Sequence, residues 1–267
     1  MRWTRVAAIV LRHLYLLRGS PSRVLPIFAW VSVDIVLWGF ITRYLNRITA
    51  AGIDFVPTLL GSVLLWDFFI RVMQGVTMTF FEDVWSRNFL NVFATPLRIP
   101  EYVAGLVLSS TLTSTVGLGV MLALATGGFG LSFLSYGALL VPFLLVLFLF
   151  GIALGVLGTA IVLRLGPASE WFVWPIPALL SPFAGVFYPV ATLPDWMQRI
   201  SRLLPPSYVF DAIRAIVRGV PPSGPSLVLA AALAVAYVLL AASAFAWVFR
   251  HAVRTGLLAR YSAESVS

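Results

Sequence analysis

The sequence contains no lysine, because arginine accounts for all 18 of its basic residues. A phosphate-binding loop of the Walker A type needs a lysine that reaches the phosphates, and Schiff-base catalysis needs a lysine amine. Cysteine is absent as well, which excludes disulfides, zinc–thiolate sites and thiol nucleophiles. The chain therefore does not bind ATP through a Walker A loop of its own.

Charged residues of any kind are scarce. They make up 10% of the chain, against 60% hydrophobic residues and a mean hydropathy of +0.98. Soluble proteins carry about a quarter charged residues, so this composition predicts an integral membrane protein. The net charge of +8 comes from arginines scattered at the ends of apolar stretches. We interpret them as signals of membrane topology and expect no nucleic-acid partner.

Six apolar stretches are each long enough for the roughly 20 residues that a bilayer requires. We expect membrane spans near residues 24–44, 57–80, 102–126, 136–163, 171–188 and 226–249. The predicted fold class is an all-α integral membrane protein with one transmembrane domain over residues 24–267. Residues 1–23 are expected to form an amphipathic helix on the inner surface. The residues expected to face lipid are Trp3, Val6, Val10, Leu14 and Leu17.

The arginines also predict the orientation. Those that precede the first span are Arg2, Arg5, Arg12, Arg18 and Arg23, and they favour an N-terminus on the inside. An even number of spans then returns the C-terminus to the inside. The last outer connection weakens this bias, because it carries Arg199, Arg202, Arg214 and Arg218.

Residues 81–100 form a polar stretch between the second and third spans. A helix over residues 81–93 would carry Phe81, Val84, Trp85, Phe89, Val92 and Phe93 on one side, and Glu82, Asp83, Ser86, Arg87 and Asn91 on the other. Asp83 and Arg87 are four residues apart, so they can pair on the wet face. Thr95-Pro96 should end this helix. The stretch is too polar for lipid and too short for a domain.

The third and fourth spans contain glycines at packing positions. Gly117 and Gly119 lie in the third span, and Gly151-x-x-x-Gly155 with Gly158 lies in the fourth. Small residues at this spacing let helix backbones approach closely in a membrane. We interpret both spans as packing elements.

The fifth span is interrupted by Trp174-Pro175-Ile176-Pro177 and by Ser181-Pro182. A broken helix in a membrane borders a pathway or is a kinked packing helix, and the sequence leaves both open. Outside it, the proline-rich residues 189–225 should hold two short helices. One opens near Asp195, and Ser207 is expected to cap the other, over residues 208–218.

Three charged residues lie inside predicted spans: Asp34 in the first, and Asp67 and Arg71 in the second. A charge at that depth costs at least ~2.5 kcal/mol, so each needs a partner or a functional reason. A structural ion pair and a role with substrate or protons both stay open. No other constellation suggests catalysis or a metal site, and we expect His13 and His251 to lie at the membrane interface.

Two stretches resemble the permease subunit of ABC-2-type exporters. The first is the inner loop, with Glu82-Asp83, Asn88-Phe89 and Ala94-Thr95-Pro96-Leu97. The second is residues 181–219, where Gly185-Val186-Phe187-Tyr188-Pro189, Leu193-Pro194, Pro205 and Ala212–Arg214 follow one another in the family's order. With six spans and both termini inside, the resemblance extends over essentially the whole chain.

This resemblance implies a permease without ATPase activity of its own, in the cell inner membrane, that exports its cargo. It implies a homodimer of permeases, or a pair of related ones, joined to two copies of a separate ATP-binding subunit, which binds the ATP and magnesium. The inner loop would dock on that subunit through Glu82, Asp83, Trp85, Arg87 and Asn91. The path or exit gate would comprise Trp174, Pro177, Phe183, Phe187, Tyr188 and Trp196.

The cargo is less defined by the sequence. Aromatic residues in the spans favour drug-like or lipidic molecules slightly, while a polysaccharide or lipid-linked saccharide is the alternative. An ion-coupled secondary transporter using Asp34, Asp67 and Arg71 is the alternative from another functional class.

Overall fold

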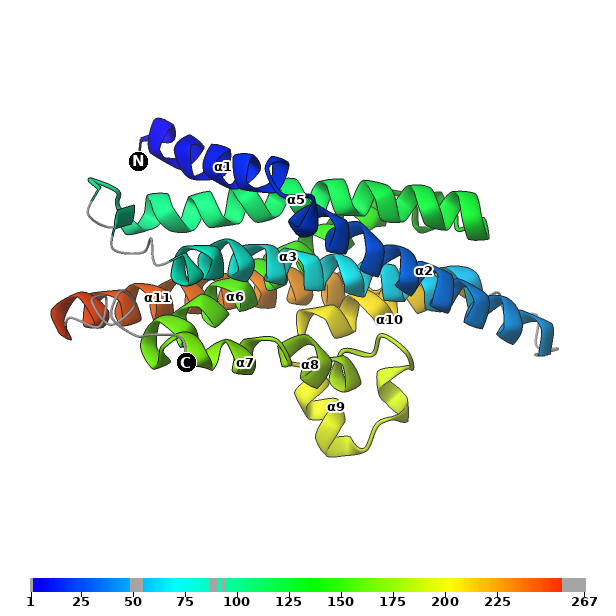
Figure 1. The fold of residues 1–267 in the computed structure, drawn as a ribbon. Helices are drawn as coiled ribbons and strands as arrows, with labels where there is room; N and C mark the ends of the chain where they lie inside the picture. The colour runs from blue at the N-terminus through cyan, green and yellow to red at the C-terminus, as the bar shows by residue number, and fades with distance from the viewer. Residues whose placement is uncertain (1, 49–54, 87–90, 93–94, 256–267) are drawn as a thin grey trace.

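The computed structural model describes all residues except 1, 49–54, 87–90, 93–94 and 256–267. The side chains of residues 21–23, 26–28 and 134–135 also lie outside the description. The described residues form helices joined by short connections, with no strand among them (Figure 1). The all-helical fold class predicted from the sequence is confirmed for this part of the chain.

Five long helices build the bundle. They are α2 (Pro21–Ile48), α3 (Gly61–Trp85), α5 (Ile99–Phe129), α6 (Leu140–Leu165) and α11 (Gly224–Thr255). A π-helical turn, η1 (Val56–Leu60), leads into α3, and a 3-10 segment, η2 (Phe133–Leu139), leads into α6. Four of these stretches are long and apolar enough to cross a membrane: Val56–Trp85, Ile99–Phe129, Tyr136–Leu165 and Gly224–Thr255.

These four stretches correspond to the predicted second, third, fourth and sixth spans. The predicted first span lies within α2, whose 28 residues exceed the roughly 20 that a bilayer requires. The predicted fifth span is broken as its prolines indicated, into α7 (Glu170–Val173) and α8 (Ile176–Ala184). With 4 and 9 residues, neither is long enough to span alone, so the count of six spans stays a prediction.

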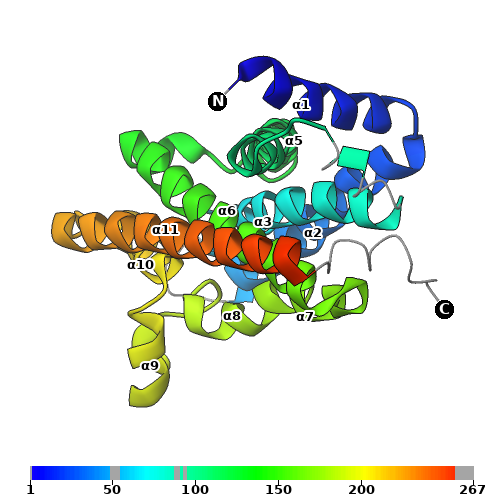
Figure 2. The same ribbon diagram turned by 90° about the vertical axis from the view of Figure 1, so that its left-hand side faces the viewer.

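Shorter elements surround the bundle. The N-terminal helix α1 (Trp3–Arg18) crosses α5 obliquely, since α5 is seen end-on in Figure 2 while α1 is seen from the side. Helices α9 (Asp195–Ser201) and α10 (Pro205–Val217) follow α8, and α9 projects from the bundle (Figures 1 and 2). Single turns η3 (Pro167–Ser169) and η4 (Val190–Thr192) complete the described elements. A surface position for α1 stays a prediction.

Both outer helices begin near where the sequence placed them, although the cap differs. Ser207 lies inside α10, which starts at Pro205, and its buried hydroxyl donates to the carbonyl oxygens of Ser201 (2.7 Å) and Leu204 (2.8 Å). The prediction that Ser207 is the N-cap is therefore wrong. Pro205 fits the first helical turn because it lacks the N–H that would go unpaired there.

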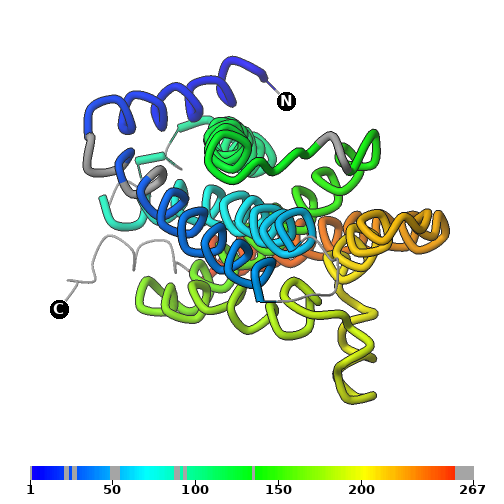
Figure 3. Tube along the Cα trace, turned by 90° about the vertical axis from the view of Figure 1, so that its right-hand side faces the viewer, coloured from blue at the N-terminus to red at the C-terminus, as the bar shows by residue number. Residues whose placement is uncertain are grey.

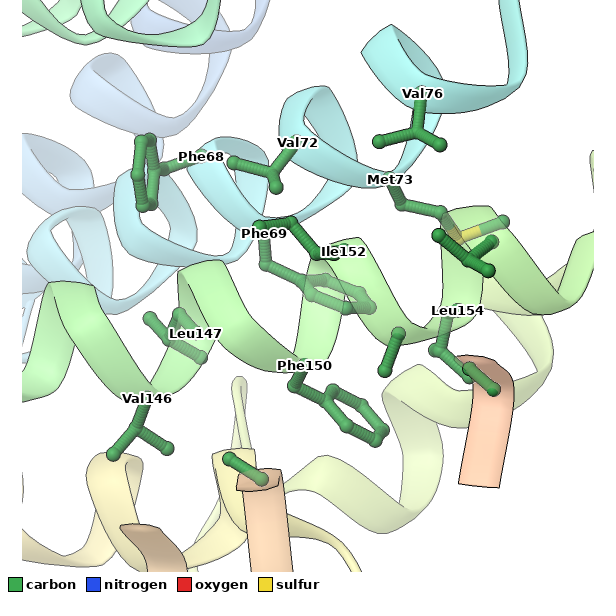
Figure 4. Close-up of a cluster of buried hydrophobic side chains, with 14 of the residues drawn as sticks. Phe68, Phe69, Val72, Met73, Val76, Val146, Leu147, Phe150, Ile152 and Leu154 are labelled. Carbon is green, nitrogen blue, oxygen red and sulfur yellow. The ribbon is translucent and has the colours of Figure 1, made fainter. Parts of the chain in front are cut away.

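Helix α3 lies at the centre, between α5 and α6 (Figure 3). One side of it carries Phe69, Val72, Met73 and Val76, which meet Phe150 and its neighbours on α6 (Figure 4). The rings of Phe69 and Phe150 stack, with their centroids 5.4 Å apart. Lipid tails are as apolar as these side chains, so close van der Waals packing holds the helices together.

The glycines of α6 permit this packing. A Cβ atom on Gly155 would lie 2.8 Å from the Met73 carbonyl oxygen, and one on Gly151 would lie 2.9 Å from Val72 Cβ. The predicted packing role of these glycines and of Gly158 is confirmed. In α5 the prediction is confirmed for Gly117, whose Cβ would touch Arg71. An added Cβ on Gly119 would meet no atom of the described residues within 4 Å, so its packing role stays a prediction.

The connections divide between the two ends of the bundle. The start of α1, the end of α3, the start of α5 and the end of α11 lie at one end, at the left of Figure 1. The ends of α2 and α5 lie at the opposite end. This division agrees with the alternation expected from the sequence, and we call the first the N-terminal end.

Candidate functional site

The candidate coupling region begins as the last turn of α3. The helix continues without a break through Phe81 to Trp85, and the Ser86 N–H closes it on the Glu82 carbonyl oxygen at 3.1 Å. The predicted boundary between a span ending at Phe80 and a separate loop helix is therefore wrong. A continuous helix joins the polar residues rigidly to the bundle centre. Arg87 and Phe89 lie outside the described residues.

Asp83 is buried, with 2% of its surface exposed. Its Oδ1 lies 2.6 Å from Arg12 Nη2 on α1, and the Tyr102 hydroxyl on α5 donates to its Oδ2 at 2.8 Å. The prediction that Asp83 lies on the wet face is wrong, because α1 covers that face and supplies the opposite charge. Its predicted partner Arg87 is outside the described residues.

A second carboxylate, Glu101 on α5, ties down the start of α1. It accepts the backbone N–H groups of Arg2 (2.7 Å) and Arg98 (3.0 Å), and Arg5 Nη1 lies 3.1 Å away. Sequence reasoning missed Glu101. The feature that could have identified Glu101 is its position in the first turn of α5, where a glutamate side chain can cap backbone N–H groups.

The third contact joins His13 and Glu82, with His13 Nδ1 3.3 Å from Glu82 Oε2. His13 is 7% exposed and therefore buried against α3, and its position at the membrane interface stays a prediction. We call the residues of these three contacts the α1 anchor: Arg2, Arg5, Arg12, His13, Glu82, Asp83, Arg98, Glu101 and Tyr102.

Apolar contacts reinforce the α1 anchor. Val6 is 1% exposed, and Ile9 packs on Gly105 of α5, where an added Cβ would lie 2.8 Å away. The expectation that Val6 faces lipid is wrong, whereas Trp3 is 71% exposed as that expectation required. Beside α1, a hollow of about 290 Å³ opens between Ile9 and Pro96.

The end of α3 also contacts α7. Trp85 Nε1 donates to Glu170 Oε2 at 3.0 Å, and the Phe81 ring lies 6.3 Å from the Trp174 ring. Trp85 and Asn91 are exposed, whereas Glu82 is half-buried. Of the predicted coupling residues, Trp85 and Asn91 are thus the ones that the described surface presents at this end.

The three charges predicted inside the membrane come together between α2 and α3. Arg71 interacts electrostatically with both Asp34 and Asp67. Its side-chain stem lies against Gly117 of α5, 3.4 Å from where a Cβ would stand. Asp67 Oδ2 is buried without a hydrogen-bond partner among the described residues. The geometry fits the predicted docking of Asp34 toward Arg71, and the role of the cluster stays open.

The predicted gate residues fall into two groups. Trp174 lies near Phe81, away from the aromatic pairs that gather where α8 ends. In one pair, Phe187 stacks on Trp38 of α2 with centroids 5.2 Å apart; in the other, Phe183 meets Trp196 edge-on at 6.3 Å. Trp38 is one of the span aromatics that favour a flat apolar cargo, but the sequence did not predict its contact with Phe187. We call Trp38, Phe183, Phe187 and Trp196 the aromatic cluster.

Arg214 on α10 contacts the end of α8, close to the aromatic cluster. Its guanidinium is buried, donates to the Gly185 carbonyl oxygen at the end of α8, and lies 3.2 Å from Asp211. Burial lowers the pKa of Arg214, and the Asp211 carboxylate opposes that shift. The Tyr188 hydroxyl donates to the Pro182 carbonyl oxygen at 3.0 Å, and Pro177 is buried. Carbonyls at the C-terminal end of α8 are thus satisfied by side chains, and the Ala178 carbonyl freed by Pro182 accepts from the Ser181 hydroxyl at 3.0 Å.

Within the described ranges, no group of three or more His, Asp or Glu side chains lies close enough together to hold a metal ion. The chemistry of the region is therefore that of hydrogen bonds, ion pairs and ring contacts between helices.

A family model described as "ABC-2 family transporter protein" matches residues 47–243. The chain belongs to the ABC-2 transporter family. The match extends from the end of α2 into α11, and it includes the end of α3, α7, α8 and the outer helices. Helix α1 and Asp34 lie before it. The resemblance inferred from the inner loop and residues 181–219 is confirmed.

Two curated relatives are named Nodulation protein J. The protein of Rhizobium meliloti (strain 1021) is 29% identical over 160 residues, which is 55% of this chain and 59% of that protein. The protein of Sinorhizobium fredii (strain NBRC 101917 / NGR234) is 28% identical over 181 residues, 66% of this chain and 67% of that protein. This ABC-2 chain thus matches about three fifths of the first relative's length and two thirds of the second's.

The α1 anchor makes a prediction about α1. Asp83→Asn should leave Arg12 facing a neutral side chain in a largely buried site, and Arg12→Gln should leave a buried carboxylate. Each change should lower the free energy of opening α1 by about 1–3 kcal/mol, less than a fully buried pair because Arg12 is partly exposed. Hydrogen exchange of residues 3–18 should then speed up roughly 5- to 150-fold.

Arg18→Gln is the matched control, because Arg18 is exposed in the last turn of the same helix. The double variant Arg12→Gln/Asp83→Asn should lose less than the sum of the single losses, since the two residues form one pair. Unchanged exchange in the single variants, or an equal change in Arg18→Gln, would contradict the α1 anchor.

Proposed function

We propose that this chain is the membrane-spanning permease subunit of an ATP-driven exporter. The observation that carries the proposal is the ABC-2 family match over residues 47–243. The absence of lysine supports a division of labour, because a Walker A loop cannot be built from this chain. ATP and magnesium would be bound by a separate subunit, present in two copies around a permease homodimer.

The N-terminal end of the bundle is the proposed docking site for that subunit. This orientation puts both termini in the cytoplasm and the chain in the inner, plasma membrane, as the arginine bias favours. Trp85 and Asn91 are exposed there. Glu82 and Asp83 act indirectly in this proposal, since they hold α1 in place and leave the contact to their exposed neighbours.

Coupling requires an element that moves as one piece. Closure of the ATP-binding subunits can shift the permease only through contacts that differ between its inward- and outward-open states. Helix α3 suits this role because it runs unbroken from Gly61 to Trp85 and is held at its end by the α1 anchor. Its movement would reach α7 through the Trp85–Glu170 hydrogen bond.

The segment from α7 to Phe187 is the proposed moving part of the path. Its prolines break it into short helices that can tilt independently, whereas α3 and α6 are packed along their lengths. Separation of Phe187 from Trp38 would open the outer end. Aromatic clusters accept flat apolar molecules, so we keep a drug-like or lipidic cargo as the first candidate.

Two alternatives stay in view. A polysaccharide or lipid-linked saccharide could also stack on the aromatic cluster, and it would be carried by the same kind of machine. Ion-coupled secondary transport is favoured only by the cluster of Asp34, Asp67 and Arg71, where Asp67 Oδ2 has no hydrogen-bond partner among the described residues.

Reconstitution tests the proposal. The chain, coexpressed with the ATP-binding protein encoded nearest to it, should purify as a complex and hydrolyse ATP in proteoliposomes. Drug-like, lipidic and saccharide cargoes are then offered in turn, with ATP or with an imposed ion gradient. We expect the cognate cargo to stimulate ATP hydrolysis and to move only with ATP. Transport driven by a gradient without ATP would overturn the proposal in favour of secondary transport.

The same preparation tests the route through α7. Trp85→Phe keeps the ring but removes the donor to Glu170, a net loss of about 0.5–1.5 kcal/mol for an exposed hydrogen bond. Assembly and basal ATP hydrolysis should persist because phenylalanine still offers an aromatic ring to the ATP-binding subunit, while transport per ATP falls about 2- to 10-fold. Trp171→Phe is the control, because Trp171 is 74% exposed. Equal transport per ATP by Trp85→Phe and Trp171→Phe would contradict coupling through the Trp85–Glu170 hydrogen bond.

A further inference from the structure

A groove of about 550 Å³ runs between α6 and α11. Its lining is apolar except for two hydroxyls and one indole N–H, and it comprises Ala153, Leu154, Leu157, Tyr237, Leu240, Ala241, Ser243, Ala244 and Trp247. Small side chains leave space between the two helices. Leu240 and Trp247 lie at the edge of the groove, with 65% and 51% of their surfaces exposed. The groove therefore opens sideways, toward the surface that faces lipid in a spanning chain.

A column of cationic and aromatic groups ends the groove. The Arg164 guanidinium carbon lies 4.7 Å from the centre of the Trp247 ring. Trp247 stacks in turn on His251, with centroids 6.0 Å apart and an interplanar angle of 12°. Arg250 and Arg254 lie on the same last turns of α11. An arginine over an indole ring is held flat, and its N–H groups stay available at the edge.

The positive charge of this column is not balanced by the helices that carry it. Neither α6 (residues 140–165) nor α11 (residues 224–255) contains an aspartate or glutamate. The acidic residue that follows in sequence, Glu170, is engaged by Trp85 at 3.0 Å. An anion is thus the complementary occupant for the end of the groove.

We infer that the groove binds a phospholipid with an anionic headgroup. An acyl chain lies along the apolar seam, and the phosphate meets Arg164 and Arg250 at the N-terminal end of the bundle. Guanidinium groups bind phosphate oxygens in bidentate fashion, and basic pockets between spanning helices on the cytoplasmic side recognise headgroups in this way. The volume is within the range of small-molecule sites.

A second copy of the chain is a weaker occupant. A two-fold contact whose axis passes beside the end of this groove would place Arg164 and Arg250 of one copy near the same residues of the other. Like charges placed together across an interface oppose association. The lipid proposal requires that the chain spans a membrane, but it does not depend on ATP-driven export, so it can be tested without ATP or cargo.

The test measures lipid binding to the purified full-length chain. Native mass spectrometry counts bound phosphatidylglycerol and phosphatidylcholine for the native chain and for Arg164→Gln/Arg250→Gln. We expect the native chain to prefer phosphatidylglycerol and the double variant to bind it about tenfold more weakly, with phosphatidylcholine unchanged. Arg199→Gln/Arg202→Gln, which removes the same charge from exposed positions of α9 and its end, should bind like the native chain.

A second readout locates the acyl chain. Phosphatidylglycerol with brominated chains should quench the fluorescence of Trp247, obtained as the difference between the native chain and Trp247→Phe. Filling the groove with Ala244→Phe should reduce that quenching. Equal binding of both lipids, an equal loss in the α9 control, or a change of oligomeric state with unchanged lipid binding would overturn the proposal, the last by assigning the groove to a second copy.

Discussion

The buried contact between Arg12, Asp83 and Tyr102 is the interaction on which the N-terminal end of this protein depends. It joins α1, α3 and α5 through one carboxylate that is 2% exposed. If α1 moved away, that carboxylate would lose its opposite charge while staying inside the bundle, which is costly in a site of low polarity. The end of α3 and the start of α5 are therefore expected to move together with α1.

This constraint shapes the mechanism that we propose for the ABC-2 chain. A force applied at the exposed residues near Trp85 would act on the end of α3, which cannot move separately from α1. Helix α3 is also packed along its length against α6 through Gly151 and Gly155. In this proposal the part that moves is the proline-broken segment of α7 and α8. A bound anionic lipid between α6 and α11 would add stiffness on the opposite side of α6.

Local patterns predicted the features that local chemistry determines. Long apolar stretches predicted the long helices, and Gly155 predicted a close packing contact. The prolines at 175 and 177 predicted the break between α7 and α8. Contacts between distant residues were missed. Nothing near Asp83 indicates that Arg12 covers it, and nothing near Phe187 points to Trp38. Both depend on how helices pack, which periodicity within one helix does not determine.

The central claim is that the N-terminal end of the bundle contacts a separate ATP-binding subunit. Since the chain has no cysteine, Asn91→Cys introduces a single thiol at an exposed position of that end, and Arg199→Cys introduces one on α9. A thiol-directed photo-crosslinker is attached to each in the assembled complex. The account predicts crosslinking to the ATP-binding subunit from position 91 and none from position 199. Crosslinking from position 199 alone would contradict it.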